Sequence, residues 1–319
     1  TQLLERLSQR FKLLRGGRRD QSSRQSSLRG LIDWSWDLLN PWEQSALAQL
    51  SVFRDGFFME AAEVILDLTP WPDAPWSLDV VGSLLDKSLL YSREDHGQPR
   101  FGMYVSIQEY AAEKLGAEFG ATAARQAQHF AQFGEEAFLD SLDTHGGAAR
   151  RRVLASELEN FLAGVNGALA AGEPEVAADC ALACAELFHM HGPYSDGIAL
   201  LERVSGQPVG RGTQGRLFCS TGRLLYLAGR YPEALEHFQQ AIAIAREMGN
   251  RREEGFNLGD LAIIHREQGH SPKALEHFQQ ALAIAREVGN RRAEGMTLGN
   301  LASLHQRQGR TQEALEHFQ

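Results

Sequence analysis

The amino-acid sequence predicts a mainly α-helical protein, in which a small helical domain with one β-hairpin and a helical bridge precede an α-solenoid of repeated helix pairs. Three observations predict this fold class. Apolar residues recur at helical spacing in most segments. One pair of strand-like segments flanks a turn-forming DHGQP sequence. A 40-residue phrase beginning at Gly229 recurs at Gly269 with 27 of 40 positions identical, and a third copy begins at Gly309. A fixed period of this length is typical of solenoids, whose units bury apolar faces against their neighbours.

Length and composition indicate a globular protein of two or three domains. The chain has 319 residues, of which 43% are hydrophobic and 23% charged. No segment approaches the ~18 apolar residues that a membrane-spanning helix needs, and no secretory leader opens the chain. Cys180 and Cys184 lie four residues apart in an Ala-rich helix and are expected to be small buried thiols. We therefore expect a reducing, cytoplasmic location without membrane partners.

Charge argues against nucleic-acid binding by the whole chain, because the net charge is −9. Residues 1–30 are an exception, with eight basic side chains against two acidic ones. Two interpretations stay open for them, a phosphate-facing segment and a solvated helix with its linker, and the second is favoured. Residues 1–20 are predicted to form a helix over 2–14 and a linker from a preceding domain.

Residues 21–118 are predicted to form a winged helix-turn-helix domain. Ser26 or Ser27 is expected to cap the first helix, and Asn40 the second, which has Pro41 in its first turn. The predicted elements are helices over 28–39, 41–53 and 59–68, a helix from 77 that runs into an apolar strand at 88–94, a second strand over 100–107, and a helix over 107–115.

This domain resembles the winged-helix segment of bacterial STAND-class signal-transduction ATPases, of the kind attached to AfsR-like and LuxR-type regulators. Three short motifs carry the resemblance: DWSWDLL, LDKSL and MYVSIQEYA. The matching positions are Asp33, Trp34, Ser35, Trp36, Leu38, Leu39, Leu85, Asp86, Lys87, Ser88, Leu89, Met103, Ile107, Glu109, Tyr110 and Ala111. Val105 departs from the family pattern, which has Glu there. The resemblance implies a domain that packs on a nucleotide-binding core and holds it closed.

Residues 119–188 are similar to the helical bridge of the same family, with Glu157, Glu159 and Asn160 at its acidic-Asn pattern. Residues 189–319 resemble tetratricopeptide repeats lengthened from 34 to 40 residues, after a degenerate first unit at 192–204. Small residues recur where helices must touch, and large apolar residues fill the space between them. The expected packing positions are Gly222, Ala234, Leu258, Leu261, Ala262, Ala274, Phe278, Ala281, Ala302 and Ala314.

The repeats also carry their own start and stop signals. Pro232 and Pro272 are expected to begin one helix of each unit. Gly249-Asn250 and Gly289-Asn290 are expected to end it, with both residues of each pair tolerating left-handed geometry. Such a stack is expected to present a groove that binds a protein partner or an effector.

No catalytic, cofactor or metal site is predicted in these residues. A phosphate loop, G-x-x-x-x-G-K-S/T, is absent, and Lys87-Ser88 lacks the glycine loop that should precede it. By the resemblance, ATP or ADP would bind in a domain upstream of Thr1. His237, His277 and His317 recur with the repeat and should point to its flank, while His265 and His305 should pack. Gly206, Gly210 and Gly212 indicate an inter-helix loop.

Arg251-Arg252 and Arg291-Arg292 leave two interpretations open, a basic rim along the groove and a solvated face, of which the second is favoured.

The preferred hypothesis is a non-catalytic regulatory and sensor fragment of a signal-transduction ATPase or transcriptional regulator. Its winged helix would contact an upstream nucleotide-binding domain, and its repeats would bind a protein or effector. The alternative is a stand-alone tetratricopeptide scaffold. Direct DNA binding is disfavoured, because the candidate recognition helices, 59–68 and 77–90, are acidic or apolar with Lys87 as their one basic residue.

Overall fold

The computed structural model describes residues 19–310 and residue 312. The predicted helix over 2–14, Ala314 and His317 lie outside the described residues. The chain divides into two compact units, one ending at Gln126 and the other beginning at Ala127. The predicted domain boundaries at 20/21, 118/119 and 188/189 stay predictions.

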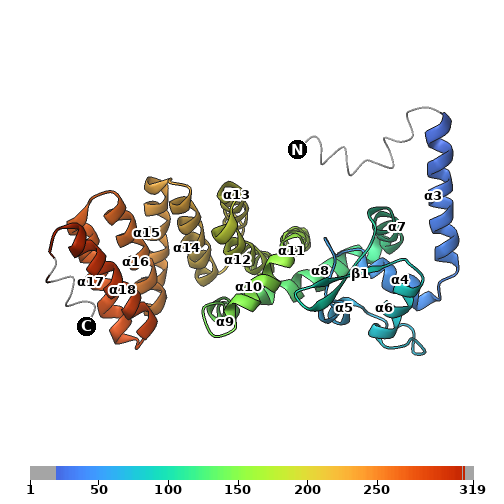
Figure 1. Ribbon diagram of the computed structural model, residues 1–319, viewed down its shortest axis with the longest axis horizontal. Coiled ribbons are helices and arrows are strands. Elements are labelled where there is room, and N and C mark those ends of the chain that lie inside the picture. Colours follow the sequence, from blue (N-terminus) through green and yellow to red (C-terminus); the bar gives the residue numbers. More distant parts are fainter. Residues whose placement is uncertain (1–18, 311, 313–319) are drawn as a thin grey trace. The chain divides into compact units, whose positions relative to one another are not determined.

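The first unit is a helical domain with one two-stranded antiparallel sheet (Figure 1). Its elements are α3 (Arg19–Asp37), α4 (Pro41–Leu50), α5 (Met59–Ile65), α6 (Ser77–Asp86), β1 (Tyr91–Asp95), β2 (Gln98–Gly102), α7 (Val105–Leu115), the short 3-10 helix η1 (Gly116–Glu118) and the start of α8 (Phe119–Ala131). The hairpin pairs Tyr91 with Gly102 and Asp95 with Gln98 across the predicted turn.

Several predicted boundaries in this unit are wrong. Helices α4 and α5 end at Leu50 and Ile65, three residues before their predicted ends. Strand β2 spans Gln98–Gly102 and not 100–107, because α7 already begins at Val105.

Helix α3 begins at Arg19, so Ser26 and Ser27 lie inside it and do not cap it. The residues before them are polar and carry no apolar period that could mark a helix in the sequence. Strand β1 begins at Tyr91 and not at Ser88. Ser88 adopts φ +58°, which takes the chain out of α6 and turns Leu89 and Leu90 into the core before pairing starts.

A buried arginine organises the core beneath the hairpin. Arg100 on β2 is 1% exposed, and its guanidinium lies 4.8 Å from the centre of the Phe58 ring. It donates to the carbonyls of Asp55 and Gly56, at 3.1 and 3.2 Å. Gly56 has φ +92°, and a Cβ there would lie 2.4 Å from the Phe101 carbonyl oxygen, so the turn requires glycine. Hydrogen bonding of the buried charge thereby fixes the turn between α4 and α5.

The second unit consists of helices that pack on their neighbours in chain order (Figure 1). After the end of α8 come η2 (Gln132–Gly134), α9 (Glu136–Ser141), α10 (Gly147–Ser156), α11 (Leu158–Ala171), α12 (Pro174–His191), α13 (Tyr194–Ser205), α14 (Arg211–Leu227), α15 (Tyr231–Glu247), α16 (Arg251–Glu267), α17 (Ser271–Glu287) and α18 (Arg291–Arg307). The architecture is that of a tetratricopeptide α-solenoid preceded by further helices.

The repeat positions expected to pack are buried wherever the structure describes them. A Cβ on Gly222 would lie 3.0 Å from the Phe238 ring, which shows how closely α14 and α15 approach. Ala262, Ala274, Phe278 and Leu301 belong to one buried cluster that joins α16, α17 and α18. The others are Ala234, Leu258, Leu261, Ala281 and Ala302, each less than 5% exposed.

Gly and Asn have different roles at the helix ends in the repeats. Gly249 and Gly289 adopt φ +68° and +67°, as expected for left-handed stops. Asn250 and Asn290 do not share that geometry, with φ −80° and −82°. Each instead caps the next helix, its side-chain oxygen accepting from the backbone N–H of Glu253 or Ala293 at 3.1 and 3.0 Å. The expected Gly-Asn stop therefore uses left-handed geometry at Gly only, and each Asn begins the next helix. Pro232 and Pro272 occupy the first turn of α15 and α17.

Overpacking tests the close approach at Ala274, which is fully buried. We expect Ala274→Leu to lower the free energy of unfolding by about 1–3 kcal/mol, because the added atoms must push α16, α17 and α18 apart. Ala283→Leu, at an exposed position of the same helix, is the matched control and should change it by less than about 0.5 kcal/mol. Urea unfolding followed by far-UV circular dichroism measures both, and equal effects would contradict the packing described here.

Candidate interaction surfaces

The family-motif residues of α3 and α7 meet each other in the first unit. The Tyr110 hydroxyl donates to Asp33 Oδ1 at 2.6 Å, and the Trp36 ring meets the Tyr110 ring edge-on at 5.7 Å. Burial and the Asp33 carboxylate raise the pKa of Tyr110. The Lys114 ammonium lies over both rings, and Arg29 pairs with Glu113 at 2.7 Å. The DWSW and EYA motifs thus join two helices 77 positions apart in the chain.

Lys87, from the DKS motif, neutralises a buried carboxylate. Its ammonium contacts both oxygens of Glu43 at 2.6 Å, and Glu43 is 2% exposed. Glu43 also accepts from the Ser83 hydroxyl and from the Asn40 N–H at the start of α4. Burial tends to raise the pKa of Glu43, but these bonds outweigh it and the pKa lies below its ordinary value. Lys87 therefore connects the end of α6 to α4.

The remaining motif residues are distributed differently. Asp86 and Ser88 are exposed, and Glu109 is half-buried on α7. The Ser35 hydroxyl donates to the Leu31 carbonyl within α3. Trp34 is 64% exposed, whereas Trp36, two positions later in the same helix, is half-buried. Within the DWSW motif, Asp33 and Trp36 hold the fold while Trp34 faces solvent.

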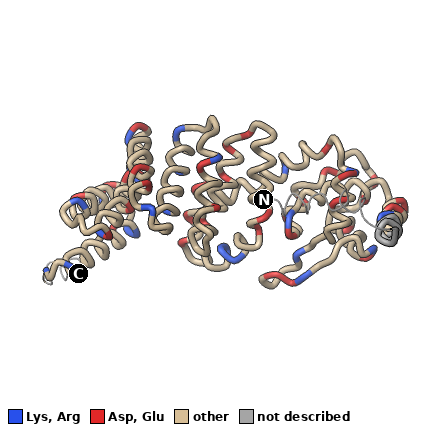
Figure 2. The backbone as a smooth tube through the Cα atoms, turned by 90° about the horizontal axis from the view of Figure 1, so that it is seen from above, with Lys and Arg blue, Asp and Glu red and all other residues tan. Residues whose placement is uncertain are grey.

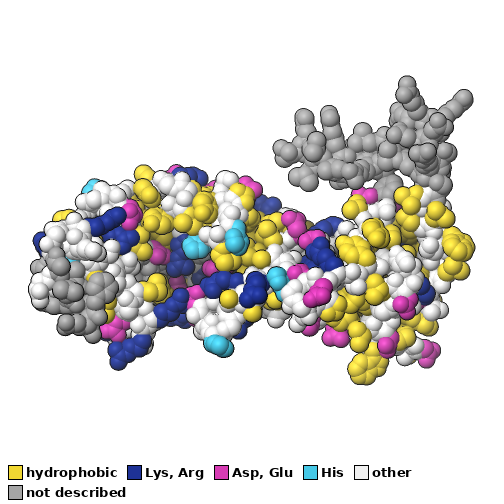
Figure 3. Space-filling view, viewed as in Figure 1, with side chains coloured by type: hydrophobic (Ala, Val, Ile, Leu, Met, Phe, Trp, Pro, Cys, Tyr) yellow, Lys and Arg dark blue, Asp and Glu magenta, His cyan; other side chains and the backbone are white. Residues whose placement is uncertain are grey.

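Trp34 belongs to an exposed apolar stripe along α3. Leu28, Leu31, Trp34 and Leu38 are 45%, 60%, 64% and 62% exposed. The spacing of the first three places them on one side of α3, and Leu38 follows directly after its end. Hydrophobic side chains gather over this part of the unit in Figure 3. We call these four residues the α3 stripe. A contiguous apolar patch on a helix is typical of a surface that another protein surface covers.

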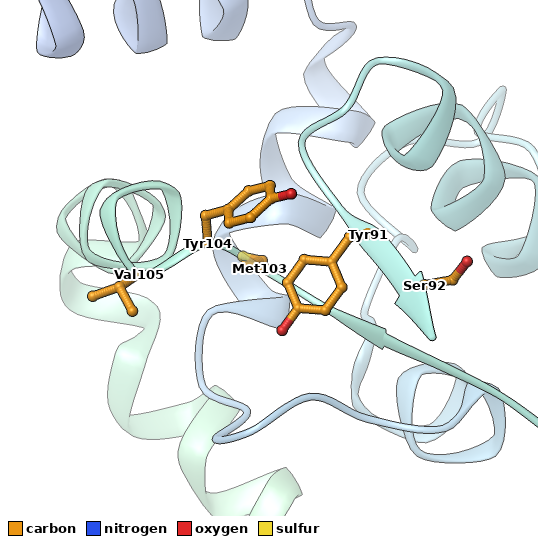
Figure 4. Close-up of a pocket in the computed structure, with 5 residues that line it drawn as sticks. All are labelled: Tyr91, Ser92, Met103, Tyr104 and Val105. Carbon is orange, nitrogen blue, oxygen red and sulfur yellow. The ribbon is translucent and has the colours of Figure 1, made fainter. Parts of the chain in front are cut away.

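A shallow depression lies beside the hairpin, with a volume of about 500 Å³. Tyr91, Ser92, Met103, Tyr104 and Val105 line it (Figure 4). The Tyr91 and Tyr104 rings lie 5.2 Å apart between centroids, and Val105 occupies the position where the family pattern has Glu. Such a surface suits an apolar side chain of a partner, and its lining offers no acid–base pair for catalysis.

The paired arginines of the repeats have two different roles. Arg251 and Arg291 contact Glu254 and Glu294 one turn away, and Arg246 and Arg286 contact the same glutamates from the preceding helix. These four arginines therefore repeat one ion cluster at successive units. Arg252 and Arg292 instead reach a segment more than a hundred residues earlier in the chain.

Arg252 lies 3.1 Å from Glu136 and 2.6 Å from Asp140, both on α9, and Arg292 lies 2.5 Å from Asp143. Arg216 on α14 contacts Asp179 at 3.1 Å and donates to the Gly134 carbonyl. We call Arg216, Arg252 and Arg292 the arginine row. In Figure 2 basic and acidic positions both mark the helices of this unit, and Figure 3 shows Lys and Arg side chains gathered from α10 towards the repeats. The sequence predicted either a basic rim or a solvated face for Arg252 and Arg292. Neither interpretation included ion pairs with an earlier segment of the same chain.

The repeat histidines pack between helices. His265 and His305 are 8% and 7% exposed, and the His277 ring stacks on the His265 ring at 5.5 Å. His237 lies against Phe218 at 5.6 Å. His277 and His237 thus face neighbouring rings, and the expectation that they point to the flank is wrong. Burial lowers the pKa of His237, His265 and His277.

The remaining candidates are metal ligands, the three cysteines and the glycines near residue 210. The described residues contain no group of three or more His, Cys, Asp or Glu side chains placed to hold a metal ion. Cys180, Cys184 and Cys219 are buried free thiols, and burial raises their pKa values. Gly206 and Gly210 lie between α13 and α14, whereas Gly212 lies inside α14 and not in the predicted loop. Within the described part of the chain, no helix is both long and apolar enough to cross a membrane.

Replacing Lys87 tests the Glu43 network. Lys87→Met leaves a buried carboxylate without its cation, and we expect the free energy of unfolding of the first unit to fall by about 1–3 kcal/mol at pH 7. Because the pKa of Glu43 is lowered in the folded state, this contribution is present above its ordinary value of 4.5 and is lost as the pH falls, so the difference should shrink in acid.

Tryptophan fluorescence during urea unfolding reports this unit alone, since all five tryptophans lie between residues 34 and 76. Arg93→Met removes a cation from a pair with Asp55 that is 47% exposed on the arginine side, and it should cost less than about 0.5 kcal/mol. A Lys87→Met effect no larger than that of this control would contradict the network.

Acidification should destabilise the repeats through their histidines. Burial is the main cause that lowers the folded-state pKa values of His265 and His277. His277, Lys273 and His270 lower the pKa of His265 further. At His277, Glu276 opposes the shift, while Lys273 and Arg246 add to it. Above the ordinary value of 6.5 both states are neutral, and below it the unfolded chain binds protons first. Stability of the second unit should therefore fall as the pH drops from 6.5 towards 5. Far-UV circular dichroism at several pH values measures it, and His265→Phe should flatten the dependence.

Comparisons with known proteins found one matching family model and several bacterial relatives. A family model described as tetratricopeptide repeat matches residues 217–287 and 257–319. A Mycobacterium tuberculosis protein named as an HTH-type transcriptional regulator is 38% identical over 109 residues, which cover 33% of this chain and 12% of that protein. An uncharacterized protein of the same bacterium is 27% identical over 133 residues, covering 41% and 34%. The chain thus spans about one eighth of the first relative.

Two solved structures are similar to this chain at low identity and with TM-scores below 0.5. A STAND protein with a tetratricopeptide repeat sensor from Pyrococcus horikoshii has a TM-score of 0.36 and 16% identity, covering 88% of this chain and 50% of that chain. The apo form of RapI has a TM-score of 0.48 and 15% identity, covering 67% and 68%. At these scores neither similarity carries an argument. The match to the family model shows that the chain contains a tetratricopeptide region within residues 217–319, and such repeats are a non-catalytic fold that mediates interactions between proteins.

Proposed function

We propose that this chain is the regulatory and sensor region of a signal-transduction ATPase or transcriptional regulator. The first unit would dock on a nucleotide-binding domain of the same protein, and the repeats would bind a protein partner. ATP or ADP would bind in that other domain. The observation that carries the proposal is the α3 stripe, an exposed apolar face on the helix whose other side holds the DWSW–EYA contact.

The stripe supports a protein-facing role for two reasons. Its four apolar side chains would each gain by removal from water, at roughly 25 cal/mol per Å² of apolar surface. The same helix is fixed from behind by Tyr110, so the stripe is presented on a rigid element and needs no rearrangement before docking.

Regulation would follow from differential binding. A partner that binds the repeats more tightly when the first unit is released from the nucleotide-binding domain shifts the population towards the released state. The size of the shift is limited by the difference in its affinity for the two states. The repeats would thereby act as the sensor and the α3 stripe as the output contact.

The test uses the full-length protein encoded by the gene. Leu31→Asp with Trp34→Asp places charges in the docked face, and we expect release of the first unit, seen as nucleotide exchange and ATP hydrolysis at least several-fold faster. Val64→Asp is the matched control, because Val64 is 55% exposed on α5 and lies outside the stripe. A full-length sequence without a phosphate-loop motif, or rates equal to those of the control, would refute the proposal.

A stand-alone scaffold is the second candidate, since the family model matches the repeats and no part of the first unit. In that case the partner would bind equally well with and without the substitutions in the α3 stripe. DNA binding has less support. Helix α6 carries Asp79 and Asp86, and Lys87 after it is paired with Glu43. A salt-dependent mobility shift with duplex DNA would reverse that ranking.

A further inference from the structure

We propose that Arg252 and Arg292 of the arginine row bind an acidic helical segment of a protein partner, and that residues 135–143 of the chain occupy this site in the partner's absence. The inference rests on the proposed function, because it names the chemistry of the partner that the repeats bind. Residues 135–143 would then compete with the partner for the same arginines.

The acidic segment has the geometry of a helical ligand. Glu136 and Asp140 lie one turn apart on α9, and Asp143 follows three residues later, just beyond its end. The four-residue spacing places the Glu136 and Asp140 carboxylates on one side of α9. Arg252 receives these two and Arg292 receives Asp143, and these arginines are the same position of two successive repeats. Carboxylates of α9 and of the turn after it thus contact two successive repeat units.

The segment is held on the row by exposed ion pairs. Side-chain exposure is 38% for Arg252, 57% for Arg292, and 49%, 47% and 37% for Glu136, Asp140 and Asp143. Exposed pairs of this kind contribute about 0.2–1 kcal/mol each. Helix α9 has no fully buried residue, although Phe138 is half-buried and its ring lies 4.9 Å from the Phe133 ring. Release of α9 from the row therefore breaks one aromatic contact and opens no fully buried core.

The turn after α9 is anchored separately. Leu142 is 1% exposed, and Arg150 and Arg151 on α10 donate to carbonyls of residues 141, 142 and 145. Asp143 also pairs with Arg151 at 2.6 Å, so it keeps a cation when Arg292 is lost. Local release of α9 is thus possible while residues 141–147 stay in place.

Acidic side chains also lie near Arg252 and Arg292, and they favour the exchange of α9 for a partner helix. Glu253 on α16 lies next to Arg252, and burial raises its pKa. Glu136 raises this pKa further, while Arg223, Arg252 and Arg216 lower it. Glu253 therefore repels Glu136 and attracts Arg252, and both effects weaken the hold of α9. Asp260 pairs with Arg223 at 2.8 Å and Asp179 with Arg216, so neither neutralises Arg252 or Arg292. A partner helix whose carboxylates avoid Glu253 would compete effectively.

A labelled peptide with the sequence of residues 135–146, EEAFLDSLDTHG, is the probe, and its binding to the full chain is measured by fluorescence anisotropy at low salt. The intact chain competes through its own segment at a high effective concentration. Glu136→Gln with Asp140→Asn in the chain removes two competing pairs, and we expect peptide affinity to rise about 2- to 30-fold.

Arg252→Glu with Arg292→Glu should weaken peptide binding at least tenfold relative to the opened variant. Arg291→Glu is the matched control, because Arg291 is 91% exposed and pairs within its own helix with Glu294. It should change affinity less than twofold. A peptide with Gln and Asn in place of every carboxylate should not bind, and higher salt should weaken binding of the acidic one. Unchanged circular dichroism spectra would show that each variant is folded.

Two outcomes would overturn the inference: equal peptide affinity in the intact and opened chains, or a loss of affinity with Arg291→Glu equal to that with Arg252→Glu and Arg292→Glu. Residues 135–143 would then have a structural role only. This outcome is separable from failure of the proposed function. The peptide experiment needs no nucleotide-binding domain, and the α3-stripe experiment does not involve the arginine row.

Discussion

The close approach of helices at small residues sets the geometry of the second unit, and the positions of its charged side chains depend on it. Gly222 against Phe238, and Ala274 within the cluster of Ala262 and Leu301, leave no space for a larger residue. Because each unit repeats the same contact, positions 40 residues apart in the sequence recur at the same place in successive units. Arg252 and Arg292 therefore become neighbours along one face, where a single acidic segment contacts both.

The first unit follows a different principle, in which buried polar groups fix helix ends and turns. Glu43 with Lys87, and Arg100 with the carbonyls before Phe57, each satisfy a buried charge by hydrogen bonds. Removing Lys87 would leave the buried Glu43 carboxylate without its cation, so such groups specify one arrangement of the helices. Asp33 and Trp36 hold one side of α3 against Tyr110, and the opposite side presents Leu31 and Trp34.

The two proposals concern different surfaces and can be judged apart. The α3 stripe is apolar and would be buried against another domain, whereas the arginine row is charged and already carries a weakly held occupant. Apolar burial favours a stable contact, and exposed ion pairs favour one that exchanges. A sensor built in this way would combine a firm output contact with a readily displaced input contact.

The helical repeats, their packing positions and the β-hairpin could be predicted from the sequence. Their signals are local: a period of 40 residues, Gly and Pro at helix ends, and alternation around DHGQP. The start of α3 could not be predicted, because polar residues at 19–27 carry no apolar period. The sequence also did not show that Gly249 alone takes the left-handed conformation while Asn250 caps the next helix.

The partners of the polar and charged residues depend on the tertiary structure. The sequence marks Lys87, Tyr110 and Arg252 as motif or repeat residues, but their partners, Glu43, Asp33 and Asp140, lie 44, 77 and 112 positions away. Nothing in local spacing identifies such partners, since a charge on a helix surface is equally compatible with water and with an ion pair. The long-range packing of the helices selects between them, and it brought residues 136–143 to the arginines of the repeats.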